Sequence, residues 1–170
     1  MLQSNFSCCP NKRENEQHNA SNLSQWQRGA ASLVSEAIVR KGEGEFPGPR
    51  YISMPVGSGK TTGAIEGVIS LCEQHPEKTV VFLSPYVIGV EKVKEQLCQS
   101  LGKDHVGFYH AKANVSKLDE VKKQVFVGTH EFAAHNHLPL EDRDLVVVDE
   151  ALYGTKDANL TTTQIYAVSA

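Results

Sequence analysis

The stretch from Met54 to Thr62 reads Met-Pro-Val-Gly-Ser-Gly-Lys-Thr-Thr and constrains the fold more than any other part of the chain. An apolar segment runs into it and a helical pattern runs out of it, so it joins a strand to a helix. In such a turn successive backbone N–H groups point inward, and the following helix adds the positive end of its dipole. The stretch therefore predicts a phosphate-binding loop in a domain of strands and helices.

The last residues of this loop follow the nucleotide-binding P-loop pattern, known as Walker A. We expect Lys60 to reach the β- and γ-phosphates of ATP and the Thr61 hydroxyl to bind Mg²⁺. Met54 stands where the pattern has Gly, so the start of the loop is expected to be slightly remodelled. An ordinary glycine-rich turn is the alternative, but it would require neither Lys60 nor Thr61. The expected phosphate cradle is Gly57, Ser58, Gly59, Lys60, Thr61 and Thr62.

Length and composition fit one domain with a substantial core, because the chain has 170 residues and 40% hydrophobic content. The formal charge of -3 argues against wholesale electrostatic binding to nucleic acid but is compatible with a local basic groove. The 4 cysteines show no C-x-x-C spacing and no apolar signal stretch is present, so we expect a reducing cytoplasm. The apolar runs are far shorter than the ~20 residues that span a bilayer, and no membrane segment is expected.

Hydrophobic periodicity predicts alternating strands and helices after a polar tail over residues 1–22. Buried strands are predicted at residues 51–54, 80–83, 106–109, 124–127 and 145–148. Helices are predicted from Leu23 with Ser24 as N-cap, from the phosphate loop to Pro76, from Ser84-Pro85 to Gly102, over 115–123, and over 131–136 with Thr129 as N-cap. This order predicts a doubly wound, mostly parallel α/β sheet within residues 23–170.

The apolar run over 145–148 ends in Asp149 and Glu150. At the carboxyl edge of the same sheet, Asp149 would hold the Mg²⁺ shell and Glu150 would polarise the attacking water as general base. Strands often end in acidic turns, so this pattern is a weak indication by itself. Together with the phosphate loop it becomes a strong one.

These residues resemble the first RecA-like motor domain of superfamily-2 helicases of the DEAD/DEAH type, with 149–152, Asp-Glu-Ala-Leu, as motif II. The resemblance implies a three-layer RecA-like P-loop NTPase fold, ATP and Mg²⁺ as cofactors, and a DNA or RNA strand as partner. Leu152 departs from the family's Asp or His, which affects the subfamily and any coupling through that residue. It does not affect the roles of Asp149 and Glu150.

Weaker family motifs fall in the expected order. Residues 23–27 resemble the adenine-reading segment, which would place Gln27 on the base; a glutamine on a solvated helix face is the alternative. Residues 84–86 resemble motif Ia and residues 127–130 motif Ib, both of which grip a nucleic-acid backbone in the family. Helix capping would explain two of these positions almost as well. The resemblance implies nucleic-acid contacts by Ser84, Tyr86, Thr129 and His130.

Residues 164–168, followed by Ser169-Ala170, resemble the strand that leads into motif III, although a helix after Leu160 fits equally well. The chain would then be a first motor domain, incomplete at its C-terminal end. The second RecA-like domain with its arginine finger is expected from a missing C-terminal part or another subunit. We therefore expect residues 1–170 alone to bind ATP but to hydrolyse it barely measurably.

Two other functions remain open. One is a different P-loop ATPase, such as an AAA+ module or a phage terminase motor, although AAA+ proteins space their Walker motifs more closely than Lys60 and Asp149. The other is a non-catalytic nucleotide-binding module. A zinc site at His130, His135 and His137 is not expected, because no cysteine pair or acidic ligand accompanies them at zinc spacing.

Overall fold

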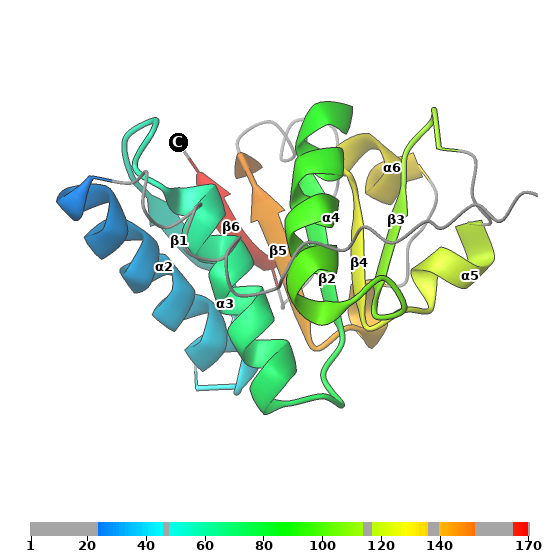
Figure 1. The fold of residues 1–170 in the computed structure, drawn as a ribbon, viewed down its shortest axis with the longest axis horizontal. Helices are drawn as coiled ribbons and strands as arrows, with labels where there is room; N and C mark the ends of the chain where they lie inside the picture. The colour runs from blue at the N-terminus through cyan, green and yellow to red at the C-terminus, as the bar shows by residue number, and fades with distance from the viewer. Residues whose placement is uncertain (1–23, 46–47, 114–116, 136–139, 152–164, 170) are drawn as a thin grey trace, which may run out of the picture.

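A computed structural model describes residues 24–45, 48–113, 117–135, 140–151 and 165–169 (Figure 1). The expected tail, Cys8, Cys9, His137, Leu152 and Ala170 lie outside the described residues. One 6-stranded sheet runs through the described part in the order β1-β6-β5-β2-β4-β3. Each pair of neighbouring strands is parallel, which confirms the predicted parallel α/β architecture. The strands are β1 (Arg50–Ser53), β2 (Val80–Ser84), β3 (Val106–Tyr109), β4 (Val125–Thr129), β5 (Leu145–Asp149) and β6 (Ile165–Ser169).

Helices cover both faces of this sheet. The helices are α2 (Gln25–Gly42), α3 (Lys60–Gln74), α4 (Val87–Leu101), α5 (Lys117–Val121) and α6 (His130–His135), with a 3-10 turn at Leu140–Asp142. In Figure 1 α2, α3 and α4 lie in front of the sheet and α6 lies behind it. The sheet has a hydrophobic core on each face, and alternate residues of β2 contribute to the two. Phe82 packs in the core that includes residues of α2, α3 and α4, and Leu83 packs in the core that includes residues of α6. Both faces of the central strands are therefore buried, which explains the continuous apolar runs in the sequence.

The predicted helix signals at Ser24, Pro76, Gly102 and Thr129 are confirmed. Ser24 caps α2 in a capping box with Gln27, and the Thr129 hydroxyl accepts the Phe132 N–H at 3.1 Å at the start of α6. α3 ends at Gln74, ahead of Pro76. Gly102 follows α4 with a φ of 91°, a conformation that glycine adopts without a steric cost.

The structure corrects two expectations and decides between two alternatives for a third segment. β1 was expected to be buried, but it lies at the edge of the described sheet and Tyr51 is 68% exposed. Ser84 ends β2 instead of opening a helix, because α4 begins at Val87 with Tyr86 as its N-cap. Residues 165–169 form a strand between β1 and β5, so the strand interpretation of this segment is confirmed.

A close contact between α2 and α3 fixes the start of α3. A Cβ atom on Gly63 would collide with the backbone of Ala31, so the two helices approach at a point that only glycine allows. Gly67 makes a similar approach to Ile38 one turn later. α2 is thereby packed closely against the first half of α3. No helix in the described part of the chain is both long and apolar enough to cross a membrane.

Candidate nucleotide-binding site

The phosphate loop lies between β1 and α3, at the carboxyl edge of the sheet. Gly57 and Gly59 have φ angles of 75° and 89°, in the left-handed region where a side chain is strained. Ser58 lies between them, only 1% exposed, and its N–H donates to the carbonyl of Pro55 at 3.2 Å. Gly59 is also the N-cap of α3, so the glycines let the chain turn sharply into the helix.

Lys60 lies inside this turn with 5% of its surface exposed. Its Nζ donates to the carbonyl oxygens of Met54 at 2.9 Å and Pro55 at 3.1 Å. Met54 takes part through its backbone while its side chain packs against the core, so its difference from Gly leaves the lysine well held. A bound phosphate would have to draw Lys60 away from these two carbonyls.

Thr61 and Asp149 meet beside the loop. The Thr61 hydroxyl donates to Oδ2 of Asp149 at 2.9 Å, while Oδ1 is buried without a hydrogen-bond partner among the described residues. Burial raises the pKa of Asp149 to about 6; the charge of Glu150 acts in the same direction, and the Thr61 bond and Lys60 oppose it. The carboxyl group is thus held in place by Thr61, and the charge of Lys60 offsets only part of the cost of its burial.

These groups fit a magnesium ion. Mg²⁺ prefers hard oxygen ligands and is bound in proteins through one or two carboxylates together with substrate phosphates and water. The site offers three such oxygens: Oδ1 of Asp149, the Thr61 hydroxyl and the buried Ser58 hydroxyl. Oδ1 of Asp149 and the Ser58 hydroxyl have no hydrogen-bond partner in the described part of the chain. No group of three or more His, Cys, Asp or Glu side chains in the described residues forms an additional metal site.

Glu150 is the non-glycine residue that has a positive φ in the described part of the chain, at 53°. A left-handed backbone at a glutamate costs free energy, and such strain often accompanies functional positions. The turn directs the chain away from β5 immediately after Asp149. Glu150 is therefore next to the expected Mg²⁺ ligand, with its side chain partly exposed.

Gln27 is engaged with the loop. Its Nε2 donates to the carbonyl of Gly57 at 2.6 Å, and its Oε1 accepts the N–H of Ser24 at 2.8 Å. One amide therefore both caps α2 and holds the phosphate loop. The expected contact with adenine stays a prediction, and it would require the amide to leave at least one of these partners.

The expected nucleic-acid contacts differ in exposure. Ser84 and His130 are 3% and 7% exposed, whereas Tyr86 is 59% exposed at the start of α4. The Thr129 hydroxyl is occupied by the Phe132 N–H. A strand laid over this edge would thus meet Tyr86 before the buried pair, and the contacts themselves stay predictions.

His130 has an unusual environment. Neither of its ring nitrogens has a hydrogen-bond partner in the described residues. Burial lowers its pKa, and the neighbouring backbone of Asp149 and Leu83 and the charge of Glu150 offset only part of this. Sequence reasoning could not detect this burial, because the ring lies beside the backbone of Leu83 and Asp149, which are distant in the chain.

Sequence reasoning also missed a hydrogen-bonded histidine at the end of β3. The Nδ1 of His110 accepts the Lys112 N–H at 3.3 Å, so Nε2 carries the proton and donates to Glu91 at 2.7 Å. Lys94 binds the other oxygen of Glu91 at 2.7 Å and lies over the Phe108 ring. These contacts tie α4 to β3, and the 19-residue separation of His110 and Glu91 hid them.

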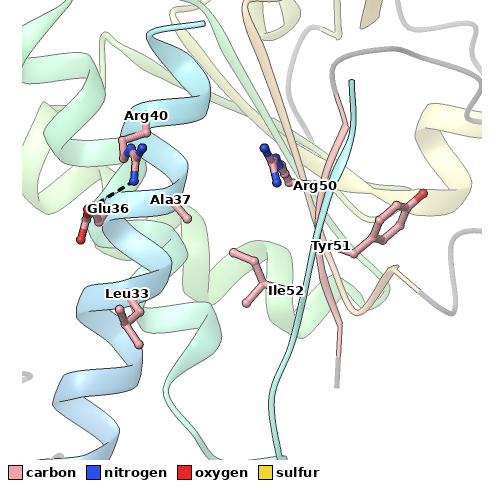
Figure 2. Close-up of a pocket in the computed structure, with 7 residues that line it drawn as sticks. All are labelled: Leu33, Glu36, Ala37, Arg40, Arg50, Tyr51 and Ile52. Carbon is pink, nitrogen blue, oxygen red and sulfur yellow. Dashed lines mark ion pairs between the residues drawn. The ribbon is translucent and has the colours of Figure 1, made fainter. Parts of the chain in front are cut away.

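A separate groove of about 310 Å³ lies between α2 and β1 (Figure 2). Leu33, Ala37 and Ile52 give it an apolar floor, and Arg40 and Arg50 line one end. None of the phosphate-loop residues lines it. The groove is therefore separate from the candidate phosphate loop.

The chain was compared with known proteins. A family model described as DEAD/DEAH box helicase matches residues 27–156. No curated protein matches the chain.

Solved structures share its fold. The T4 UvsW structure has a TM-score of 0.58 and 12% identity over 92% of this chain and 34% of that one. The Sulfolobus solfataricus SWI2/SNF2 ATPase core in complex with dsDNA has a TM-score of 0.55 and 17% identity, over 87% of this chain and 32% of that one. The DUF1998 helicase MrfA has a TM-score of 0.55 and 15% identity, over 94% of this chain and 29% of that one. This chain thus spans about a third of each, and the expected RecA-like helicase-core fold is confirmed.

Proposed function

Because this chain belongs to the DEAD/DEAH box helicase family, we propose that residues 23–170 form the ATP-binding domain of a nucleic-acid-dependent ATPase. The observation that carries the proposal is the hydrogen bond of Thr61 to Asp149 beside a loop that already encloses Lys60. It joins the phosphate-binding and acidic halves of the site. An ordinary strand-to-helix turn would need neither group.

Each residue has a stated part in the reaction. The backbone from Gly57 to Thr62 would bind the phosphate oxygens, and Lys60 would move from the loop carbonyls to the γ-phosphate. Thr61 and Asp149 would hold Mg²⁺, which neutralises the developing phosphate charge when bound. Glu150 would take the proton of the attacking water.

The proposed partner is a DNA or RNA strand at the carboxyl edge of the sheet. The support is the family membership, the dsDNA named for the SWI2/SNF2 ATPase core, and the exposed Tyr86 at the start of α4. An aromatic ring at that position can stack on a base. Efficient turnover would further need an arginine from a second RecA-like domain, so we expect residues 1–170 alone to bind ATP and hydrolyse it very slowly.

Titration with a fluorescent ATP analogue in Mg²⁺ buffer tests the proposal. Lys60→Ala removes the ammonium that the loop presents to phosphate, and we expect it to weaken binding by about 10- to 100-fold or more. The matched control is Lys92→Ala on the exposed side of α4, which should bind like the wild type. Equal affinity of Lys60→Ala and the wild type would contradict the assignment.

A further inference from the structure

His130 is a buried polar side chain that the proposed ligands do not explain. It is 7% exposed, and both ring nitrogens are without a hydrogen-bond partner among the described residues. Buried polar groups are nearly always paired in native proteins, so each exception calls for a cause. The buried unpaired oxygens of Ser58 and Asp149 have one in the proposed function, which places them at the phosphate and Mg²⁺ site. His130 belongs to another strand.

The position of His130 links two parts of the sheet edge. It is the first residue of α6 and follows Thr129, the end of β4. β2 lies between β4 and β5, with Leu83 paired to Gly128 on one side and to Val148 on the other. The ring lies beside the backbone of Leu83 and Asp149, so it reaches across β2 toward the acidic pair.

Glu150 is the group in this neighbourhood that has most to gain from a partner. It directly follows the last residue of β5, just as His130 directly follows the last residue of β4, and only β2 lies between these two strands. Its backbone is left-handed, with a φ of 53°, and this costly conformation needs compensating interactions. A general base must also be held within hydrogen-bond reach of its water, which requires an orienting donor.

We propose that His130 is a positioning residue: it donates a ring N–H to the Glu150 carboxylate when Mg²⁺ and nucleotide occupy the phosphate loop, and so aims that carboxylate at the attacking water. The inference rests on the proposed function of the loop. It does not depend on protonation, since a neutral or a charged imidazole carries at least one N–H. Because Thr129 is its neighbour, a nucleic-acid strand that shifts the start of α6 would shift the ring, and thereby couple strand binding to hydrolysis.

Long-range ¹H–¹⁵N NMR of the ¹⁵N-histidine-labelled chain tests this directly. The His130 signals are identified by their absence in His130→Phe. We expect Mg²⁺ with a non-hydrolysable ATP analogue to shift the His130 ring nitrogens in the wild type. The shift should vanish in Glu150→Ala, which retains analogue binding, and persist in Glu131→Ala, an exposed acid on the same helix. The His110 ring, already bonded to Glu91, is the internal reference.

The outcomes separate this inference from the function beneath it. Lys60-dependent binding with an unmoved His130 signal, or with an equal shift in Glu150→Ala, would overturn the inference and leave the nucleotide site standing. Absence of any Lys60-dependent binding would overturn both. If Glu150→Ala fails to fold, Glu150→Gly replaces it, because glycine suits the left-handed backbone at this position.

Discussion

The hydroxyl of Thr61, at the start of α3, donates a 2.9 Å hydrogen bond to Oδ2 of Asp149, at the end of β5 and 88 residues later. The contact brings together the oxygen ligands that a magnesium ion would need, at the mouth of the phosphate loop. The protein itself holds these groups in place. The consequences can be measured both with and without a nucleotide.

We predict that Asp149→Asn stabilises the ligand-free protein at pH 8. The folded pKa of about 6 lies above the ordinary 3.8, so the folded state binds the proton more tightly. This contribution to stability is complete below pH 3.8 and is lost as the pH rises through 6, by on the order of 2–3 kcal/mol. The amide carries no charge and escapes the loss.

Urea unfolding of both proteins at pH 5 and pH 8 measures this effect, with the exposed Asp142→Asn as the control. The same Asp149→Asn protein should show a weaker Mg²⁺ dependence of nucleotide binding. A variant less stable than the wild type at pH 8 would show that the Thr61 bond outweighs the cost of burial.

We predict that Glu150→Gln preserves Mg²⁺-nucleotide binding and lowers hydrolysis by about 10²- to 10⁴-fold in a protein that includes a second motor domain. The amide keeps the shape of the side chain but cannot accept the proton of water. Single-turnover hydrolysis with single-stranded DNA or RNA measures the rate. Turnover of Glu150→Gln near the wild-type rate would show that another residue is the general base. Nucleotide binding without strand-stimulated hydrolysis in the unmodified motor would favour the alternative of a non-catalytic nucleotide-binding module.

We predict that Gln27→Ala weakens nucleotide binding several-fold. The variant frees the Gly57 carbonyl and removes half of the capping box, so the phosphate loop is less well ordered before it binds. Analogue titration gives the affinity. Gln25→Ala is the matched control on the exposed first turn of α2, and an equal effect of both changes would point to the helix instead of the loop contact.

We predict opposite effects of alanine at two glycines. Gly63→Ala should destabilise the fold by about 1–3 kcal/mol, because its Cβ would press on the backbone of Ala31. Gly29→Ala should stabilise it by about 0.5–1 kcal/mol, because Gly29 is inside α2 with open space around it. Thermal unfolding of the two variants checks the sign, and a stable Gly63→Ala protein would mean that α2 shifts freely.

The elements of the fold could be read from the sequence because their causes are local. The runs over 80–83 and 145–148 are apolar throughout, as strands buried on both faces must be. Capping at Ser24 and Thr129 depends on residues three positions away. The expected burial of β1 was wrong because the position of a strand within the sheet is a long-range property, and only the strand order places β1 at the edge of the described sheet.

The candidate site divides in the same way. Sequence alone predicted the candidate loop from Gly57 to Thr62 and the candidate acids Asp149 and Glu150, because their residue types and spacing are those that phosphate and Mg²⁺ binding require. Only the tertiary structure decided the bond of Thr61 to Asp149, the hold of Gln27 on Gly57 and the burial of His130. Each of these depends on which strands become neighbours and how closely helices approach, and long-range packing fixes both.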